Sequence, residues 1–500
     1  MTVDLKPLIA LRFLTKLSTI SRFLARKDIK AYLVGGFVRD VLLGRDTADI
    51  DIAVAGNALE VAHDMAAHFS GKYVLLDEAN RVGRVIMHDV NGRWQIDFST
   101  LDGDIEQDLA RRDFTVDALA VDLRQVTEDA AEVQVVDLFG GLEDLGSGVI
   151  RAVSQTVFES DAVRLMRAVR LAAELGFKIE SQTEALIRQN AGLIAAVAGE
   201  RIREELLRIL AVPGHQLLSY LDELGVLTSI MPELDQLKGV SQPKEHFWNV
   251  FEHTLETVAA VDFLLRQGGC SYADDKVLSV VPWSAILAEH FGQEVSGGST
   301  GRIMLKMAAL LHDLAKPQTK SIEATGRMRF LGHAKEGAVM AVAILERLRF
   351  SNKEIKLLET IVEHHLRPGQ MSNVGLPTSR AVYRYFRDTG DAGKDILFFS
   401  LADHLATRGP RLDLAAWREH AQIVEYVLAQ HSEQRDVVAP PRIIDGHDLI
   451  DIFDMSPGPR MGELLEAVRE AQAAGDVATR DDALSYIRKH LLSEGVKING

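Results

Sequence analysis

The stretch that decides the fold of the first part of the chain is LVGGFVRDVLLGRDTADIDIAV, residues 33–54. It predicts a buried strand at 31–34 that runs into Gly35 and Gly36, and then a helix that starts near Phe37. Glycines at such a turn let backbone N–H groups approach an anion closely at a helix N-terminus. The sequence therefore predicts a strand, a glycine turn and a helix arranged to hold a phosphate.

Carboxylates follow this turn on a second predicted strand, DIDIAV at 49–54. Asp49 and Asp51 are two residues apart, so a strand places both side chains on one face. Asp97, on the later predicted strand RWQIDFS, is a candidate third carboxylate. Such carboxylates hold Mg²⁺, which prefers oxygen ligands and shares its shell with substrate phosphates. We therefore expect a metal-dependent phosphoryl or nucleotidyl transfer site. The alternative is a tight turn followed by solvated charges at a strand edge.

The rest of the pattern predicts an α+β protein in which a mixed sheet with helices is followed by an almost wholly helical chain. Proline pairs and Pro-Gly steps mark the breaks. The expected parts are a head at 1–150, a helical neck at 151–215, a helical block at 216–435 and a helical tail at 440–500. Further strands are expected at 72–76, 83–90 and 93–99, and helices at 5–28, 160–175, 182–198, 200–211, 461–474 and 480–492.

Composition excludes several classes of protein. The 500 residues carry 56 lysines and arginines against 72 aspartates and glutamates, a formal net charge of −16, which excludes binding of nucleic acid through bulk positive charge. The net charge does not exclude a local basic groove. Cys270 is the single cysteine, which excludes a disulfide framework and a cysteine-rich zinc site. No apolar run reaches 18 residues, so we expect no membrane span and no membrane partner, and a cytoplasmic protein without a signal peptide. The oligomeric state is not determined by the sequence.

Five segments in order resemble the motifs of the class II tRNA nucleotidyltransferase and bacterial poly(A) polymerase family. Together they cover about residues 30–211. They are the segment at 33–54, ARRDFTVDALAVDL at 110–123, VVDLFGGLEDL at 135–145, SDAVRLMRAVRLAAELGF at 160–177 and ERIREELLRIL at 200–210. The resemblance implies a nucleotidyltransferase that uses Mg²⁺ and acts on tRNA with CTP and ATP.

The resemblance also implies a role for each matching residue. Catalytic carboxylates would be Asp49, Asp51 and Asp97, of which Asp49 and Asp51 would hold the metals. Residues that would meet the nucleotide are Gly35, Gly36, Arg39, Arg112, Asp161, Arg164, Arg167 and Arg170.

Base selection would rest on Asp161 and Arg164. A carboxylate accepts a hydrogen bond from the exocyclic amino group of CTP or ATP, and a guanidinium donates to ring acceptors. GTP and UTP lack that amino group at the matching position, so an unpaired buried charge would reject them. Arg167 and Arg170 follow at three-residue steps, which wind around a helix, so these arginines cannot all face one ligand equally. The alternative is a solvated helix face with i,i+3 ion pairs.

Three features depart from the family pattern. Asp117 stands where asparagine is common, so that position offers an acceptor or a protonated carboxyl. Ser160 stands where glutamate is frequent. The connection from Asp97 to Arg111 is short, FSTLDGDIEQDLA, whereas many complete CCA-adding members have a longer mobile loop there. A short loop resembles members that add only part of the CCA end, and the sequence leaves full and partial addition open.

A second set of side chains lies in the helical block and resembles the HD-domain metal-dependent phosphohydrolases. Imidazole and carboxylate ligands suit a divalent transition metal or Mg²⁺, which would generate a hydroxide that attacks a phosphate ester. The expected ligands are His253, His312, Asp313, Asp403 and His333, completed by His364, with His365 as its alternative. The alternative is an inactive HD fold in which the histidines are merely hydrogen-bonded.

The sequence therefore predicts a template-independent tRNA nucleotidyltransferase that adds CMP or AMP, with a phosphatase or 2′,3′-cyclic phosphodiesterase activity at the HD site. The tail resembles the helices with which such enzymes grip the tRNA body, the alternative being a small packing unit. Other functions left open are a partial CC- or A-adding enzyme, a poly(A) polymerase, a phosphohydrolase whose head only binds nucleotide, and a non-catalytic RNA-binding protein.

Overall fold

The computed structural model describes residues 2–4, 11–45, 47, 49–89, 92–126, 132–371, 375–433, 438 and 440–493. The chain forms two compact units. The first consists of Met1–Val197 and Tyr220–Ile230, and the second of Ala198–Ser219 and Met231–Gly500. The predicted division into head, neck, helical block and tail stays a prediction. The part of the chain that the structure describes contains no helix long and apolar enough to cross a membrane.

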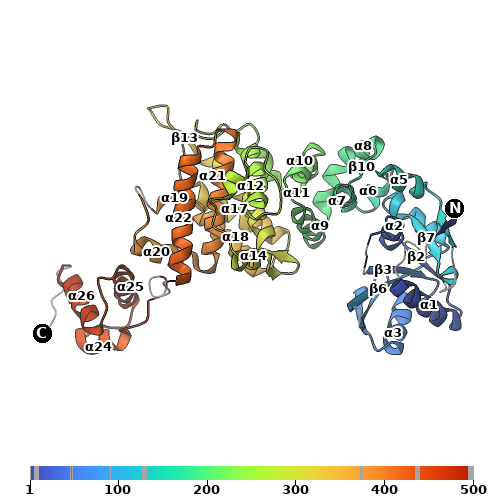
Figure 1. Ribbon diagram of the computed structural model, residues 1–500, viewed down its shortest axis with the longest axis horizontal. Coiled ribbons are helices and arrows are strands. Elements are labelled where there is room, and N and C mark those ends of the chain that lie inside the picture. The colour runs from blue at the N-terminus through green and yellow to red at the C-terminus, as the bar shows by residue number, and fades with distance from the viewer. Residues whose placement is uncertain are drawn as a thin grey trace. The chain divides into compact units, whose positions relative to one another are not determined.

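An eight-stranded sheet forms the centre of the first unit (Figure 1). Its order is β1-β8-β7-β2-β3-β6-β5-β4, and all neighbours are antiparallel except β3 and β6. The strands are β1 Thr2–Asp4, β2 Ala31–Val34, β3 Asp49–Val54, β4 Lys72–Asp77, β5 Val82–Asp89, β6 Gly92–Thr100, β7 Leu119–Asp122 and β8 Glu132–Asp137.

The helices of the first unit follow or flank these strands. They are α1 Leu11–Arg26, α2 Gly36–Leu42, α3 Ala58–His68, α4 Ile105–Ala110, α5 Gly141–Ser147, α6 Val157–Ser160, α7 Arg164–Leu175, α8 Ser181–Asn190 and α11 Val226–Ile230, with α10 Gln216–Glu223 crossing the division between the units. Short 3-10 turns lie at Thr115–Asp117, Leu123–Gln125 and Ala191–Ala196, and a two-stranded sheet joins β9 Val149–Ile150 to β10 Lys178–Ile179.

The strand predictions are confirmed, because each expected strand forms within one residue of its predicted ends. The four apolar residues of β2 are all buried, and Gly35 turns the chain into α2. Two helix predictions were too long. Asp161 has extended backbone with φ −157° and its side chain accepts a hydrogen bond from the backbone N–H of Val163, so α7 begins only at Arg164. The helix expected at 182–198 ends at Asn190 and continues as a 3-10 turn. Of the helix expected at 5–28, residues 5–10 lie outside the described residues.

The second unit is almost wholly helical. Its elements are α9 Gly199–Ala211, α12 Val250–Leu264, α13 Asp275–Leu278, α14 Ala285–Gly292, α15 Gly301–Leu311, α16 Lys316–Thr319, α17 His333–Arg347, α18 Asn352–His364, α19 Arg367–Gln370, α20 Ser379–Thr389, α21 Gly393–Arg408, α22 Leu414–Glu433, α24 Gly446–Phe453, α25 Pro459–Ala474 and α26 Arg480–Ser493. Short 3-10 turns lie at Pro232–Leu237, Gly390–Ala392 and Gly409–Arg411. Two small hairpins pair β11 Glu294–Ser296 with β12 Ser299–Thr300, and β13 Lys320–Ile322 with β14 Met328–Phe330.

A buried ion pair fastens the chain after α9 to this unit. Lys306 and Asp262 are both fully buried, and their Nζ and Oδ2 atoms lie 2.6 Å apart. Lys306 also donates to the carbonyl of Val212, and Asp262 accepts from the backbone N–H of Gly214. Buried charges are retained only when they are paired and hydrogen-bonded, and here both conditions hold.

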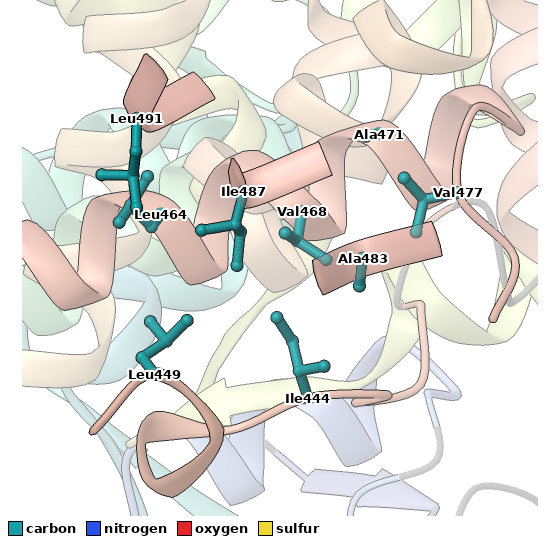
Figure 2. Close-up of a cluster of buried hydrophobic side chains, with 9 residues drawn as sticks. All are labelled: Ile444, Leu449, Leu464, Val468, Ala471, Val477, Ala483, Ile487 and Leu491. Carbon is teal, nitrogen blue, oxygen red and sulfur yellow. The ribbon is translucent and has the colours of Figure 1, made fainter. Parts of the chain in front are cut away.

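The last three helices have a hydrophobic core of their own. Figure 2 shows nine buried apolar side chains from α24, α25, α26 and the segments beside them: Ile444, Leu449, Leu464, Val468, Ala471, Val477, Ala483, Ile487 and Leu491. Thr479 and Asp482 form the N-terminal cap of α26.

Candidate active site and metal centre

A cavity of about 270 Å³ lies where the glycine turn meets strands β3 and β6. Asp51 and Asp97 are register partners on these two parallel strands, so their carboxylates share one face of the sheet. The predicted residues that line the cavity are Gly35, Gly36, Asp51, Asp97, Arg112 and Arg167. The first motif and the two carboxylate strands therefore meet at one place.

Gly35 can only be a glycine. Its φ of +67° is a backbone conformation that side chains rarely adopt, and an added Cβ would lie 2.6 Å from the Nη1 atom of Arg112. Arg112 is itself held by Asp108, whose Oδ2 accepts from Nε and Nη2 at 3.1 and 3.0 Å. The turn thus brings backbone and guanidinium donors to the same wall of the cavity.

The three carboxylates differ in their surroundings. Asp49 is exposed, and its Oδ1 accepts from Nε2 of Gln95 at 2.8 Å. Arg84 donates to both oxygens of Asp97 at 2.7 Å each. Burial raises the pKa of Asp51 to about 7, and the nearby charge of Asp97 contributes to this rise. The charge of Arg112 opposes this rise, and a divalent metal bound here would favour the ionised form of Asp51 further.

Asp117 also lines the cavity and binds Arg39, whose Nη1 donates to Oδ1 of Asp117 at 2.6 Å. Arg39 also donates to Asp40, and it is not among the residues that line the cavity. Burial raises the pKa of Asp117 to about 6, against the opposing charge of Arg39. The aspartate that departs from the family pattern is therefore the anionic partner of a buried arginine.

The arginines of α7 diverge, as the winding of the helix predicts. Arg167 lines the cavity and its Nη1 donates to Oδ2 of buried Asp113 at 2.9 Å. Arg170 is buried and pairs with Glu174 at 2.6 Å. Arg164 donates to the carbonyl of Arg111 at 2.8 Å and to the hydroxyl of Ser160 at 3.1 Å.

Asp161 and Arg164 lie together at the start of α7, with Oδ2 and Nε 3.9 Å apart. Neither is among the residues that line the cavity. Their base-reading role stays a prediction.

The HD residues form the second constellation, deep in the helical unit. Two sets of three side chains each place one ligand atom within 4.8 Å of the others: His253, His312 and Asp403 form one, and Asp313, His333 and His365 the other. Asp313 joins them, because its Oδ2 lies 3.1 Å from Nε2 of His312. Three separate helices, α12, α21 and α17, contribute His253, Asp403 and His333, and the other residues directly follow α15 or α18.

The chemistry of this donor set fits metal ions. The Nδ1 atoms of His312, His333 and His365 lie 2.9, 2.7 and 2.7 Å from backbone carbonyl oxygens, which only accept, so each Nδ1 carries the proton. The Nε2 lone pairs then face the cluster. Within the described chain, Nε2 of His333 is buried without a hydrogen-bond partner, and Nε2 of His253 lies 3.0 Å from Oδ1 of Asp403. Such back-bonded imidazoles are the usual form of metal-ligating histidines.

His365 takes the place predicted for His364. Buried residues of α18 include Leu358, Ile361 and Val362, and His365 continues this stripe three residues later. His364 turns instead toward another cavity, which it lines together with Lys356 and Arg387. The helical period of the buried residues is the sequence signal that separates the two histidines.

A wider cavity of about 870 Å³ opens onto this cluster. Lys316 lines it, with its Nζ 2.6 Å from Oδ2 of Asp313. Burial lowers the pKa of His365 to about 3. Burial alone would raise the pKa of Asp403, but the hydrogen bond and charge of His253 outweigh it and hold that pKa well below its usual range. Burial also lowers the pKa of His253 and of His333 and so favours their neutral, metal-binding form, whereas at His312 the charge and hydrogen bond of Asp313 outweigh burial and raise the pKa.

Comparison with known proteins places both constellations in known families. Residues 31–151 match the family described as "Poly A polymerase head domain", and 275–408 match "HD domain". Residues 176–238 match "Probable RNA and SrmB- binding site of polymerase A", and 403–487 match "tRNA nucleotidyltransferase domain 2 putative".

Relatives similar over nearly the whole chain decide the family. An A-adding tRNA nucleotidyltransferase of Deinococcus radiodurans is 34% identical over 467 residues, which is 92% of this chain and 95% of that protein. The chain belongs to the tRNA nucleotidyltransferase family. A CC-adding tRNA nucleotidyltransferase of Thermus thermophilus is 31% identical, over 93% of this chain and 94% of that protein. The solved CCA-adding enzyme of Thermotoga maritima complexed with tRNA has the same fold, with a TM-score of 0.58, 22% identity and coverage of 98% and 99% of the two chains.

Sequence reasoning missed two residues of the nucleotidyltransferase site. Arg84 lies opposite Asp97 because the β5–β6 hairpin pairs Asp89 with Gly92, and counting back from that turn would have found it. Asp113, in the segment ARRDFT, also lines the cavity. The motif resemblance assigned a role to Arg112 in this segment and none to the carboxylate that follows it. At the HD site, Lys316 was missed, although it lies one helical turn after Asp313.

Proposed function

We propose that this tRNA nucleotidyltransferase transfers CMP or AMP from CTP or ATP to the 3′ end of tRNA, in the cytoplasm. The tRNA 3′-hydroxyl attacks the α-phosphate and pyrophosphate leaves. The observation that carries the proposal is the parallel pairing of Asp51 with Asp97 beside the glycine turn. Around one cavity lie these carboxylates and the hydrogen-bond donors that could bind a phosphate.

The residues of the site divide the work. Asp49 and Asp51, with Asp97, would hold Mg²⁺, which when bound activates the hydroxyl and stabilises the leaving group. Backbone N–H groups at Gly35 and Gly36 and the guanidinium of Arg112 would meet the triphosphate. Arg84 holds Asp97 in place through two hydrogen bonds and so acts as a positioning residue.

Nucleotide choice would rest on α7 and the residues before it. Asp161 and Arg164 would read the base edge, as the motif implies. Arg167 would support them, because its guanidinium reaches the cavity and is held by Asp113. Arg39 and Arg170 would act from behind the site, since both are buried in ion pairs with Asp117 and Glu174.

We propose further that the chain adds only part of the CCA end. The connection between β6 and α4 contains only four residues, Leu101–Asp104. Such a short connection supplies no long loop for a switch from CTP to ATP. The relatives from Deinococcus radiodurans and Thermus thermophilus, which cover over nine-tenths of the chain, are named as A-adding and CC-adding enzymes.

The test uses three tRNAs that end after the discriminator base, after C and after CC, each incubated with CTP, ATP or both. Partial addition predicts incorporation of one nucleotide only: CMP into the first and second tRNAs, completing CC on each, or a single AMP into the third. Complete CCA on the first tRNA would contradict partial addition while keeping the nucleotidyltransferase. Long A tails on unrelated RNA would instead indicate a poly(A) polymerase.

We propose a second activity, metal-dependent hydrolysis of phosphate esters, at the HD cluster. The observation that favours it is a set of buried imidazoles whose Nδ1 atoms are hydrogen-bonded to backbone carbonyls. Their Nε2 atoms face the carboxylates of the cluster. A divalent transition metal or Mg²⁺ bound there would supply a hydroxide at neutral pH. Hydrolysis of p-nitrophenyl phosphate and of 2′,3′-cyclic nucleotides, with and without a chelator, tests this activity. Lack of turnover with every divalent metal would contradict it.

A further inference from the structure

Helix α20 presents three arginines and a tyrosine on one face. Arg380, Arg384 and Arg387 follow at i, i+4 and i+7, and Tyr383 lies between them, so all four side chains share a side of the helix. Rows of arginine with an aromatic residue among them are typical of surfaces that bind nucleic-acid backbones. We refer to these four residues as the arginine face.

Carboxylates of the tail occupy this face. Arg384 donates to both oxygens of Glu470, at 2.8 and 2.5 Å. Glu466 accepts from the hydroxyl of Tyr383 at 2.9 Å and from Arg387 at 3.3 Å. Arg380 reaches Asp476 at 2.9 Å. These interactions have the geometry that a phosphate would adopt, because carboxylate and phosphate both accept the two parallel N–H bonds of a guanidinium.

Charged and polar contacts join α20 to α25, among them Arg384–Glu470 and Tyr383–Glu466. The buried cluster of the tail is made by residues of the tail itself, from Ile444 to Leu491 (Figure 2). The arginine side chains remain 42%, 51% and 37% exposed in the order Arg380, Arg384, Arg387. Half-exposed ion pairs are weak and are screened by salt. The exposed parts of the three arginine side chains are therefore accessible to an RNA phosphate while the tail carboxylates still occupy the arginine face.

The tail is acidic as a whole. Residues 442–493 contain ten aspartates and glutamates against six lysines and arginines. Backbone phosphates are therefore attracted to α20 rather than to the acidic side of α25. We propose that the arginine face binds RNA backbone phosphates, and that Glu466 and Glu470 occupy it until RNA displaces them. The inference rests on the proposed function only in taking RNA as the substrate.

The experiment measures binding of tRNA by fluorescence anisotropy, without CTP or ATP, over a range of salt concentrations. The double variant Glu466→Gln/Glu470→Gln removes the competing charges and should tighten binding about three- to tenfold, the size expected for a few exposed ion pairs. Its matched control is Asp451→Asn/Asp481→Asn, which makes the same charge change at exposed positions of α24 and α26. The control should change binding less than twofold.

A second variant, Arg384→Gln/Arg387→Gln, should weaken binding and lower the salt dependence, by about one unit of log–log slope for each phosphate that the variant no longer binds. Arg349→Gln, an exposed arginine of the same unit, is its control. Unchanged or weaker binding by the Glu466→Gln/Glu470→Gln protein, with an unaltered melting curve, would overturn the proposal, because a merely structural interface predicts that sign. Nucleotide addition is assayed separately, so failure of the proposed function is distinguishable.

Discussion

The two candidate metal sites of this chain differ in the electrostatics of their side chains. In the head, carboxylates crowd on neighbouring strands, and burial beside Asp97 raises the pKa of Asp51 to about 7. In the HD cluster, burial lowers the pKa of His365 to about 3, and neighbouring imidazoles hold Asp403 ionised. A site made only of carboxylates therefore depends on a bound cation to relieve the repulsion between like charges. A site with buried imidazoles such as His365 already holds neutral ligands before a cation binds.

The two sites also differ in what positions them. Asp51 and Asp97 are fixed by the hydrogen-bond register of β3 and β6, and Arg84 by the register of β5 and β6. The HD ligands come from helices far apart in sequence, and backbone carbonyls set the ring orientation of His312 and His365. Head geometry is therefore local to one sheet, and HD geometry depends on helix packing.

The largest expected effect is the loss of nucleotide addition when one of the head carboxylates is replaced. Asp49→Ala or Asp51→Ala should lower CMP or AMP incorporation into tRNA by at least about a thousandfold, because the metals that neutralise the reacting phosphate lose a ligand. Asp64→Ala, at an exposed position of α3, is the control. Incorporation that survives either site substitution would break the assignment of these residues.

A complementary loss is expected at the HD cluster. His312→Ala and His365→Ala should lower bound metal, measured by elemental analysis, and reduce ester hydrolysis by about a hundredfold or more while nucleotide addition stays within twofold. His364→Ala is the matched control, because that ring faces another cavity. If His364→Ala loses metal and His365→Ala keeps it, the cluster is wrongly assigned.

Removal of the clamp on Asp97 should have a smaller effect. Arg84→Gln leaves Asp97 in place but without its two hydrogen bonds, and outer residues of this kind contribute about 10- to 100-fold. We expect nucleotide addition to fall by about tenfold, mainly in kcat, with HD hydrolysis unaltered. Arg124→Gln, which breaks an exposed pair in the same sheet, should be silent; equal losses from both variants would show that sheet stability alone is measured.

The smallest expected effect is a pH response of opposite sign in the two units, measured by thermal unfolding in EDTA. Folded Asp51, with a pKa of about 7 instead of 3.8, binds a proton that the unfolded chain releases, so the first unit loses stability as pH rises from about 4 to 7. His365, and His246 that lines the cavity beside the HD cluster, have pKa values lowered from 6.5 to about 3 and resist protonation when folded. The second unit therefore loses stability as pH falls below about 6.5.

Each shift should be a few degrees in Tm. Mg²⁺ or Asp51→Asn should flatten the first response, and a first unit whose Tm rises with pH would contradict the described electrostatics of the head.

Prediction from sequence succeeded where chemistry is local. Local patterns in the sequence predict the strand AYLV, the glycine turn after it and the pair of carboxylates two residues apart. Strand alternation alone places Asp49 and Asp51 on one face. The sequence left His364 and His365 open as alternatives, because adjacent histidines look alike until the buried residues of α18 are placed in space, and the structure brings His365 into the cluster. Prediction also missed that Arg39 and Arg170 are held in ion pairs rather than at the cavity.

The sequence by itself determined the family, the five motifs and the types of ligand at both sites, because these depend on residue identity at short spacing. Only the tertiary structure decided that Asp113 and Arg84 belong to the head site, that His365 completes the HD cluster, and that carboxylates of the tail lie on the arginine face. The physical reason is that strand register and helix packing bring together side chains that are far apart in sequence, and charge pairing between them is settled only by distance.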